Sequence, residues 1–235
     1  MDMSPRFLRT RSTHRSSEDD DAIQDRPPHL GFQAAMTPEK ALEVLKAGNA
    51  RFVAGKTTHR NLPASVRATA AGQYPFGAVV SCMDSRVPVE LVFDLTVGDA
   101  FSLRLAGNVI DPDILGSLEF ATKVAGANLI LILGHTHCGA VLGAIDNVVL
   151  GNLTDLLAKI APAVAAVGPG SSKDDSYVDR VAEQNVRLSM RAVRDRSPVL
   201  KDLLASGSVR LAGAIYDIET GRVKFLADRG HEANA

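Results

Sequence analysis

The chain has 235 residues, of which 46% are hydrophobic, and its formal net charge is −1. This length is typical of one large domain, and the hydrophobic content is ample for a sizeable core. The near-neutral charge, with basic residues scattered rather than clustered among aromatic ones, argues against a nucleic-acid partner. No apolar run approaches the length that spans a bilayer, so no membrane association is expected.

The first 35 residues differ in composition from the rest of the chain. They are polar, carry the charge block SSEDDD and are broken by RPPHL. Such a segment cannot bury much surface, so residues 1–35 are predicted to be a disordered leader before a single domain at 36–230. The leader has basic residues but no apolar stretch of the kind found in secretory signals, which makes a cytoplasmic location the default expectation.

The predicted elements begin with an N-terminal helical arm in MTPEKALEVLKAGNARFVAG. Thr37 is expected to cap it, with Pro38 at the first helical position, and Gly55 is expected to end it. FGAVVS and DAFSLRLAG then read as strands, with a short helix in VPVELVF between them. DILGSLEFATKVAG has the spacing of an amphipathic helix that ends at Gly126.

The second half of the chain continues the alternation of strands and helices. ANLILILG is the most strand-like run, and CGAVLGAIDNVV predicts the helix after it. Residues from about 154 to 206 are mostly helical in pattern, apart from the loop GPGSSKDDS. VRLAGAIYDI and RVKFLAD, joined by ETG, predict a strand and a C-terminal edge hairpin strand. The whole pattern predicts an α/β fold with a mostly parallel central β-sheet flanked by helices.

The only two cysteines fall just beyond two predicted strands. Cys82 follows the first of these strands, and His135 and Cys138 follow the later one. Ligands bind beyond the carboxyl ends of strands in open α/β sheets, so these three residues are expected to converge. Two thiolates and one imidazole suit zinc, and three protein ligands with an exchangeable fourth position are the catalytic pattern. The alternative is that both cysteines are small buried hydrophobes and the histidine a satisfied polar group.

Asp84 and Arg86 follow Cys82 at two and four positions. Asp84 can reach a metal directly or accept a proton from metal-bound water, and Arg86 can hold this carboxylate bidentately, away from the metal. The two would then gate the fourth position of the metal. The alternative is that Asp84 or Ser85 simply caps the short helix that follows, with Pro88 in its first turn.

The motifs CMDSR at 82–86 and HTHCG at 135–139 resemble the signature of the β-class carbonic anhydrases. The similarity extends through PEKALEVLKAGNARFVAG, SLRLAGNVI and LGSLEFA, over about residues 37–227. It implies one Zn²⁺ per chain on Cys82, His135 and Cys138, with Asp84 and Arg86 as the dyad. It further implies reversible hydration of carbon dioxide to bicarbonate and a proton by attack of zinc-bound hydroxide. Self-association as a dimer or a dimer of dimers, with active sites near the subunit interface, is also implied.

The resemblance extends to a substrate pocket of the plant-like subgroup. Gln73 aligns with the glutamine that hydrogen-bonds the substrate, and Phe101 aligns with the pocket phenylalanine. Phe120 stands where that subgroup has tyrosine, and Ala106 replaces a bulkier aliphatic residue. The expected substrate-binding residues are Gln73, Val87, Phe101, Ala106 and Gly139.

Several alternatives remain open from the sequence. Hydrolases of carbon disulfide or carbonyl sulfide resemble β-carbonic anhydrases and share the zinc ligands, so pocket access would decide between them. A non-catalytic zinc protein would keep Asp84 as a permanent fourth ligand, which would leave Arg86 without its partner. His137 is either a proton shuttle or a packed or solvent-facing residue, and its adjacency to Cys138 disfavours it as a ligand in place of His135. No G-x-G-x-x-G follows the first strand, so a dinucleotide-binding fold is set aside.

Overall fold

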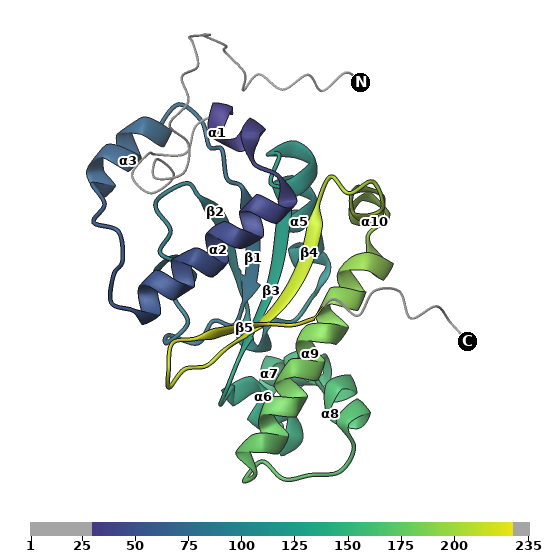
Figure 1. Cartoon of the computed structure of the whole chain (residues 1–235). Coiled ribbons are helices and arrows are strands. Elements are labelled where there is room, and N and C mark those ends of the chain that lie inside the picture. Colours follow the sequence, from purple (N-terminus) through teal and green to yellow (C-terminus); the bar gives the residue numbers. More distant parts are fainter. Residues whose placement is uncertain (1–29, 228–235) are drawn as a thin grey trace.

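A computed structural model describes residues 30–227, which fold around one five-stranded sheet (Figure 1). The strands are β1 (Gly77–Ser81), β2 (Ala100–Arg104), β3 (Leu129–His135), β4 (Arg210–Tyr216) and β5 (Val223–Phe225). The α-helices are α1 (Leu30–Ala35), α2 (Pro38–Val53), α3 (Leu62–Thr69), α4 (Val89–Val92), α5 (Pro112–Glu119), α6 (Gly139–Ile145), α7 (Gly151–Ala158), α8 (Ala161–Val167), α9 (Asp175–Arg196) and α10 (Pro198–Ala205). Two further turns are η1 (Ala106–Asn108, 3₁₀) and η2 (Phe120–Val124, π). None of the described helices is long and apolar enough to cross a membrane.

The sheet has the strand order β2-β1-β3-β4-β5 and confirms the predicted fold class. The first four strands of that order run parallel, and β5 pairs antiparallel with β4 as the edge hairpin strand. The hairpin turn is closed by Asp217, which accepts hydrogen bonds from Glu219 N and Thr220 N, and by Gly221 at φ 74°. The register aligns Ser81 with both Arg104 and Leu133, so β1, β2 and β3 end close together.

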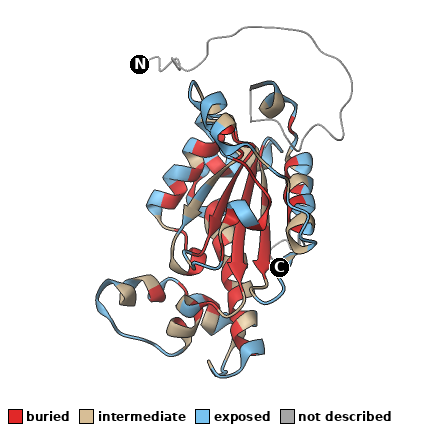
Figure 2. Cartoon of the chain, turned by 90° about the vertical axis from the view of Figure 1, so that its left-hand side faces the viewer, coloured by how far each residue is buried: buried red, intermediate tan, exposed pale blue. Residues whose placement is uncertain are grey.

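Successive strand residues point to opposite sides of the sheet, and apolar strand residues occur on both sides, so helices cover both faces. One face packs Leu42, Leu45 and Phe93, from α2 and the end of α4, against the strands. The other face packs residues of α5, α9 and α10 against Val80, Ile132 and their neighbours. A third buried cluster lies at the carboxyl ends of the strands, where α6, α7, α8 and the start of α9 meet (Figures 1 and 2).

The N-terminal part of the domain begins earlier than the sequence predicts. Residues 1–29 of the predicted disordered leader lie outside the described residues, but Leu30–Ala35 form α1, so the expectation of disorder does not hold for 30–35. Gln33 Nε2 donates to Pro75 O and Ala125 O, each at 2.7 Å, and these bonds tie α1 to the start of β1 and the end of η2. These two hydrogen bonds of Gln33 attach α1 to the domain, and the polar composition of the segment does not predict them.

The predicted helix ends agree with the structure in α2 and differ in α5. Thr37 caps α2, since its hydroxyl accepts from Lys40 N, and Pro38 is the first helical residue. The helix predicted up to Gly126 is α-helical only to Glu119 and continues as the π-turn η2, which Ala125 N closes onto Phe120 O at 2.9 Å. The sequence interpretation also left out α3, which Asn61 caps by accepting from Ala64 N.

Candidate metal centre and active site

Three of the predicted site residues meet at the carboxyl end of the parallel sheet. Cys82 directly follows β1, and His135 is the last residue of β3, where it pairs with Tyr216 of β4. Cys138 is the N-cap residue of α6 (φ −72°, ψ 116°), one position before the first helical turn in which it was expected. The strand ends thus bring the three side chains together, as the alternation of strands and helices predicts.

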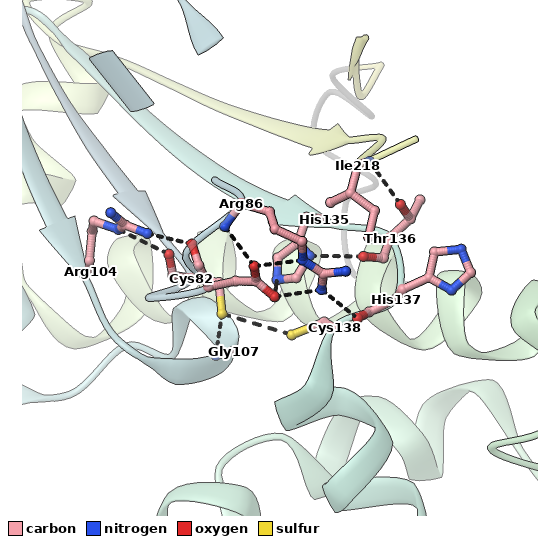
Figure 3. Close-up of polar contacts among 10 residues, drawn as sticks. Cys82, Arg86, Arg104, Gly107, His135, Thr136, His137, Cys138 and Ile218 are labelled. Atoms are coloured by element: carbon pink, nitrogen blue, oxygen red, sulfur yellow. Dashed lines mark hydrogen bonds and ion pairs between the residues drawn. The ribbon is translucent and has the colours of Figure 1, made fainter. Parts of the chain in front are cut away.

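The geometry of this cluster suits a tetrahedral metal ion. The ligand atoms of Cys82, His135 and Cys138 all lie within 4.8 Å of one another, and all three residues are buried. The two Sγ atoms are 4.0 Å apart and face each other in Figure 3. Tetrahedral zinc with Zn–S bonds of about 2.3 Å would hold two sulfurs about 3.8 Å apart. The sulfur pair therefore already has nearly the spacing that such an ion requires.

The imidazole of His135 is oriented by the main chain. Its Nδ1 lies 2.8 Å from Thr136 O, which makes Nδ1 the protonated nitrogen and leaves a lone pair on Nε2. Thr136 is itself fixed, because its N–H donates to Tyr216 O and its hydroxyl accepts from Ile218 N. Nε2 is buried and has no hydrogen-bond partner within residues 30–227. A buried, unpartnered nitrogen beside two thiols is the atom that a metal would satisfy.

The contact between the two thiols shifts their pKa values in opposite directions. The hydrogen bond from Cys138 is the main cause that lowers the pKa of Cys82 to about 4, against burial, which raises it. The same bond and burial raise the pKa of Cys138. One thiolate is therefore present at neutral pH, and a cation that binds both sulfurs would displace the second proton.

Asp84 is held by Arg86 in a bidentate pair. Arg86 Nε and Nη2 donate to the two carboxylate oxygens at 2.9 and 2.7 Å, and the Arg86 main-chain N–H donates to Oδ1 at 2.9 Å. These bonds lower the pKa of Asp84 to about 2. Its Oδ2 lies 3.9 Å from His135 Nε2, so the carboxylate stands beside the cluster while it faces Arg86. The arrangement is the one in which Asp84 leaves the fourth position open.

The alternative role for this segment, helix capping, is wrong. The helix α4 starts at Val89, its N-cap residue is Pro88, and no side chain bonds to its free N–H groups. Asp84 and Ser85 precede that cap by several residues. Their turn is closed instead by Val87 N, which donates to Asp84 O at 3.0 Å.

The sequence interpretation missed two residues of β2 and η1 that surround Cys82. Arg104 Nε donates to Cys82 O at 3.2 Å and its Nη2 to Asp84 O at 2.6 Å, so one guanidinium bridges the carbonyls on both sides of Met83. Gly107 N donates to Cys82 Sγ at 3.3 Å. The string SLRLAGNVI contains both residues. Gly107 contributes only its main-chain N–H, which the residue type does not predict. Gly107 could have been noticed only as a glycine just after a predicted strand.

The predicted substrate residues fall into two groups. Ala106 begins η1 beside Gly107, and Gly139 is an exposed residue at the start of α6, where an added Cβ would meet no atom within 4 Å. Val87 is completely buried and packs in the core under α2 and α4. Gly139 directly follows Cys138, and Ala106 precedes Gly107, whose N–H donates to Cys82 Sγ. Val87 is a core residue.

Gln73 and Phe101 lie away from the cluster within this chain. Gln73 is exposed and precedes β1, whereas Cys82 follows it, and a five-residue strand spans about 16 Å. Phe101 is aligned with Ala78, four residues before Cys82, and its ring packs edge-on against Phe120 with centroids 6.2 Å apart. The structure therefore does not bring these two residues to the metal-ligand candidates of the same chain.

His137 stands apart from the ligand cluster. Its ring points away from the two sulfur atoms (Figure 3), and its two nitrogens lie 3.6 Å from Asp175 Oδ1 and 3.5 Å from Glu219 Oε1. Its backbone has φ 52°, which turns the chain between His135 and Cys138. This placement agrees with a solvent-facing residue and argues against His137 as a ligand.

Fold and site together define an α/β protein with a buried Cys-His-Cys set that could hold a metal ion. A family model for carbonic anhydrase matches residues 77–223, which include every residue of that set. Carbonic anhydrase 2 of Mycobacterium tuberculosis is 39% identical over 191 residues, which cover 79% of this chain and 91% of that protein. A carbonic anhydrase of Mycolicibacterium smegmatis is 37% identical over 199 residues, covering 82% and 95%.

Solved structures agree with this relationship. The β-carbonic anhydrase CafA of Aspergillus fumigatus superposes with a TM-score of 0.65 at 29% identity, over 83% of this chain and 92% of that chain. One of two tetrameric β-carbonic anhydrases of Sordaria macrospora gives a TM-score of 0.63 at 26% identity, over 80% and 97%. The chain belongs to the carbonic anhydrase family, and its fold and motifs place it in the β class.

Proposed function

We propose that this carbonic anhydrase is a zinc enzyme that hydrates carbon dioxide reversibly to bicarbonate and a proton, with one Zn²⁺ per chain on Cys82, His135 and Cys138. The observation that carries the proposal is the buried His135 Nε2, which has no hydrogen-bond partner among residues 30–227 and faces two thiols 4.0 Å apart. Sulfur and nitrogen donors in this number suit zinc with one exchangeable position. When bound, zinc supplies the Lewis acidity that makes hydroxide available from water near neutral pH.

Asp84 and Arg86 are proposed to act as the gating dyad. Arg86 keeps the carboxylate ionised and turned from the ligand atoms, which supports an open fourth position. From its place 3.9 Å from His135 Nε2, Asp84 Oδ2 can accept a hydrogen bond from the reacting water and hold its remaining proton away from carbon dioxide. A permanently closed zinc site would need Asp84 to leave all three donors of Arg86, so these bonds argue for a catalytic site.

The substrate pocket is proposed to be completed by a second copy of the chain. Gly139 directly follows Cys138 and has open space where a Cβ would stand, and Ala106 precedes Gly107, so both small residues are proposed to border the carbon dioxide site. Gln73 precedes β1 and Phe101 lies near the start of β2, away from the metal-ligand candidates of their own chain, so these two residues of the plant-like pattern are proposed to serve a metal site across a subunit interface. A dimer or a dimer of dimers would supply them, in agreement with the tetrameric relatives from Sordaria macrospora. A cytoplasmic location stays a prediction from the sequence.

The test is the isosteric variant Asp84→Asn, compared with Asp155→Asn at an exposed position of α7 as a matched control. Zinc per chain is measured first, and carbon dioxide hydration is then followed by stopped flow. We expect both variants to bind one zinc and Asp84→Asn alone to lose turnover by about 100-fold or more, the usual size of a proton-transfer contribution. Undiminished turnover of zinc-loaded Asp84→Asn would contradict the role of the dyad. A purified wild-type chain that binds no zinc would contradict the metal site.

A further inference from the structure

The helix α9 holds the turn η1 through two successive carbonyl groups. Asn185 Nδ2 donates to Gly107 O at 2.8 Å, and Ser189 Oγ donates to Asn108 O at 3.3 Å. Asn185 and Ser189 are four residues apart, so they lie on the same face of the helix. Both are buried, with 3% and 5% exposure. Within residues 30–227, the hydrogen bonds of these two side chains go to the main chain of η1 and not to a metal-ligand candidate.

Gly107 connects this anchor to the candidate ligand Cys82. Its carbonyl accepts from Asn185, while its own N–H donates to Cys82 Sγ at 3.3 Å. Gly107 has φ 67°, which residues with a side chain rarely adopt, and an added Cβ would lie 2.5 Å from Ile160 Cδ1, so glycine is strongly favoured here. Because a left-handed glycine has wide conformational freedom, its own geometry does not fix the direction of its N–H. Within η1, Asn108 N donates to Leu105 O at 3.0 Å. From outside the turn, the buried Asn185 side chain adds a hydrogen bond to the Gly107 carbonyl, which limits how far this residue can rotate.

We propose that Asn185 is a positioning residue, which holds Gly107 so that its N–H donates to the Cys82 sulfur and thereby weakens Cys82 as an electron donor to the metal. A hydrogen bond to a thiolate withdraws charge from the sulfur, so the bound ion keeps more of its own charge. The bond lies in a buried part of the chain, where such electrostatic effects are larger than in water. Two thiolates make an ion a weaker Lewis acid than neutral ligands do, and this bond partly offsets that.

The inference rests on the metal site proposed above, and it concerns only the cysteine that follows β1. Cys138 is the N-cap residue of α6, so the start of its own helix surrounds it. The two sulfurs are therefore held by different parts of the fold. The hydrogen bond of Asn185 leads through Gly107 to Cys82, so a change at Asn185 should alter the metal–sulfur bond of Cys82 more than that of Cys138.

The first experiment uses the wild-type protein loaded with ¹¹³Cd, which takes the place of zinc and is visible by NMR. Cadmium bound per chain is measured first, so that failure of the metal site is recognised separately. We expect a scalar coupling between ¹¹³Cd and the Gly107 amide proton, transmitted through the Cys82 sulfur. A fully loaded protein in which the Gly107 amide shows no such coupling would overturn the proposal, and this result needs no variant to fold.

The second experiment compares Asn185→Leu and Asn185→Asp with the control Ser189→Ala, all loaded with Co²⁺. Leucine fills the space and aspartate keeps the shape, but an ionised carboxylate cannot donate to Gly107 O. Loss of the bond to sulfur raises the energy of its lone pair, so the sulfur-to-cobalt charge-transfer band should shift to longer wavelength in both Asn185 variants. Ser189→Ala also removes a bond from α9 to η1 and should leave the band in place. An unshifted band in fully loaded Asn185 variants, or an equal shift in Ser189→Ala, would contradict the proposal.

Discussion

Two aspartates on the loop between α4 and β2 should respond in opposite ways to the same substitution. Asp99 is buried, and its carboxylate accepts from Thr96 N at 2.7 Å. Burial raises its pKa to about 6 from the usual 3.8. Asp94 is also buried, but its burial is outweighed by hydrogen bonds from Arg51 Nε at 2.6 Å and from Thr58, so its pKa is lowered. Asp99→Asn should stabilise the fold at neutral pH, and Asp94→Asn should destabilise it.

The size of the effect at Asp99 follows from the pKa. The difference between about 6 and 3.8, at 1.36 kcal/mol per pKa unit, corresponds to a cost of about 3 kcal/mol for the ionised carboxylate above pH 6. An asparagine removes this cost but accepts a weaker bond from Thr96 N, by about 1 kcal/mol. The net gain at pH 7.5 should therefore be about 2 kcal/mol. For a chain of this size that corresponds to a rise of about 4–8 °C in Tm.

The pH dependence gives this prediction its sign. Between pH 3.8 and about 6 the folded state holds a proton on Asp99 that the unfolded state has lost, so wild-type stability falls as pH rises through this window. The advantage of Asp99→Asn should be full well above pH 6 and should shrink steadily as the pH falls from about 6 towards 3.8. Asp94→Asn should cost about 1.5–3 kcal/mol, since it removes a charge-assisted bond. Urea unfolding at pH 5 and pH 7.5 measures both, and a destabilised Asp99→Asn at pH 7.5 would refute the reasoning.

Two more variants test how β2 and η1 support the site. Arg104→Met removes the bridge between Cys82 O and Asp84 O, so turnover per bound zinc should fall several-fold. Arg104→Lys should recover part of the turnover. Equal turnover in the Met and Lys variants would contradict the bridge. Gly107→Ala places a Cβ 2.5 Å from Ile160 Cδ1 at φ 67°. This substitution should lower the free energy of unfolding, measured with urea, by about 2–4 kcal/mol. A loss below about 1 kcal/mol would contradict this prediction and show that η1 can shift to accept the methyl group.

Much of the fold could be predicted from the alternation of apolar strands and helices, and the three metal-ligand candidates could be predicted because they follow the ends of two strands. Continuous apolar strands with helices between them fix a parallel sheet, and that sheet places Cys82 and His135 at one edge. The helix α1 could not be predicted, since Gln33 binds main-chain carbonyls of distant segments. Gly107 was missed for a similar reason, because its contribution is an N–H that every non-proline residue has.

The substrate pocket could be predicted only in part, because an aligned residue type does not say which copy of the chain contributes it. Gln73 and Phe101 are predicted as pocket residues from a resemblance to a plant-like pattern. Gln73 precedes β1 and Phe101 lies near the start of β2, so both are away from Cys82 of the same chain. The orientation of Asp84 likewise depends on distances that sequence spacing does not contain. Its three bonds from Arg86 appear only once the turn at 84–87 is built.

The most direct test of the account is stopped-flow hydration of carbon dioxide by protein whose zinc content is known, from about pH 6.5 to 9, the range in which a zinc-bound water is expected to ionise. We predict one zinc per chain and a turnover that rises with pH. One zinc per chain with no turnover at any pH would contradict the account. Carbonyl sulfide would then be the next substrate to try on the same zinc-loaded protein.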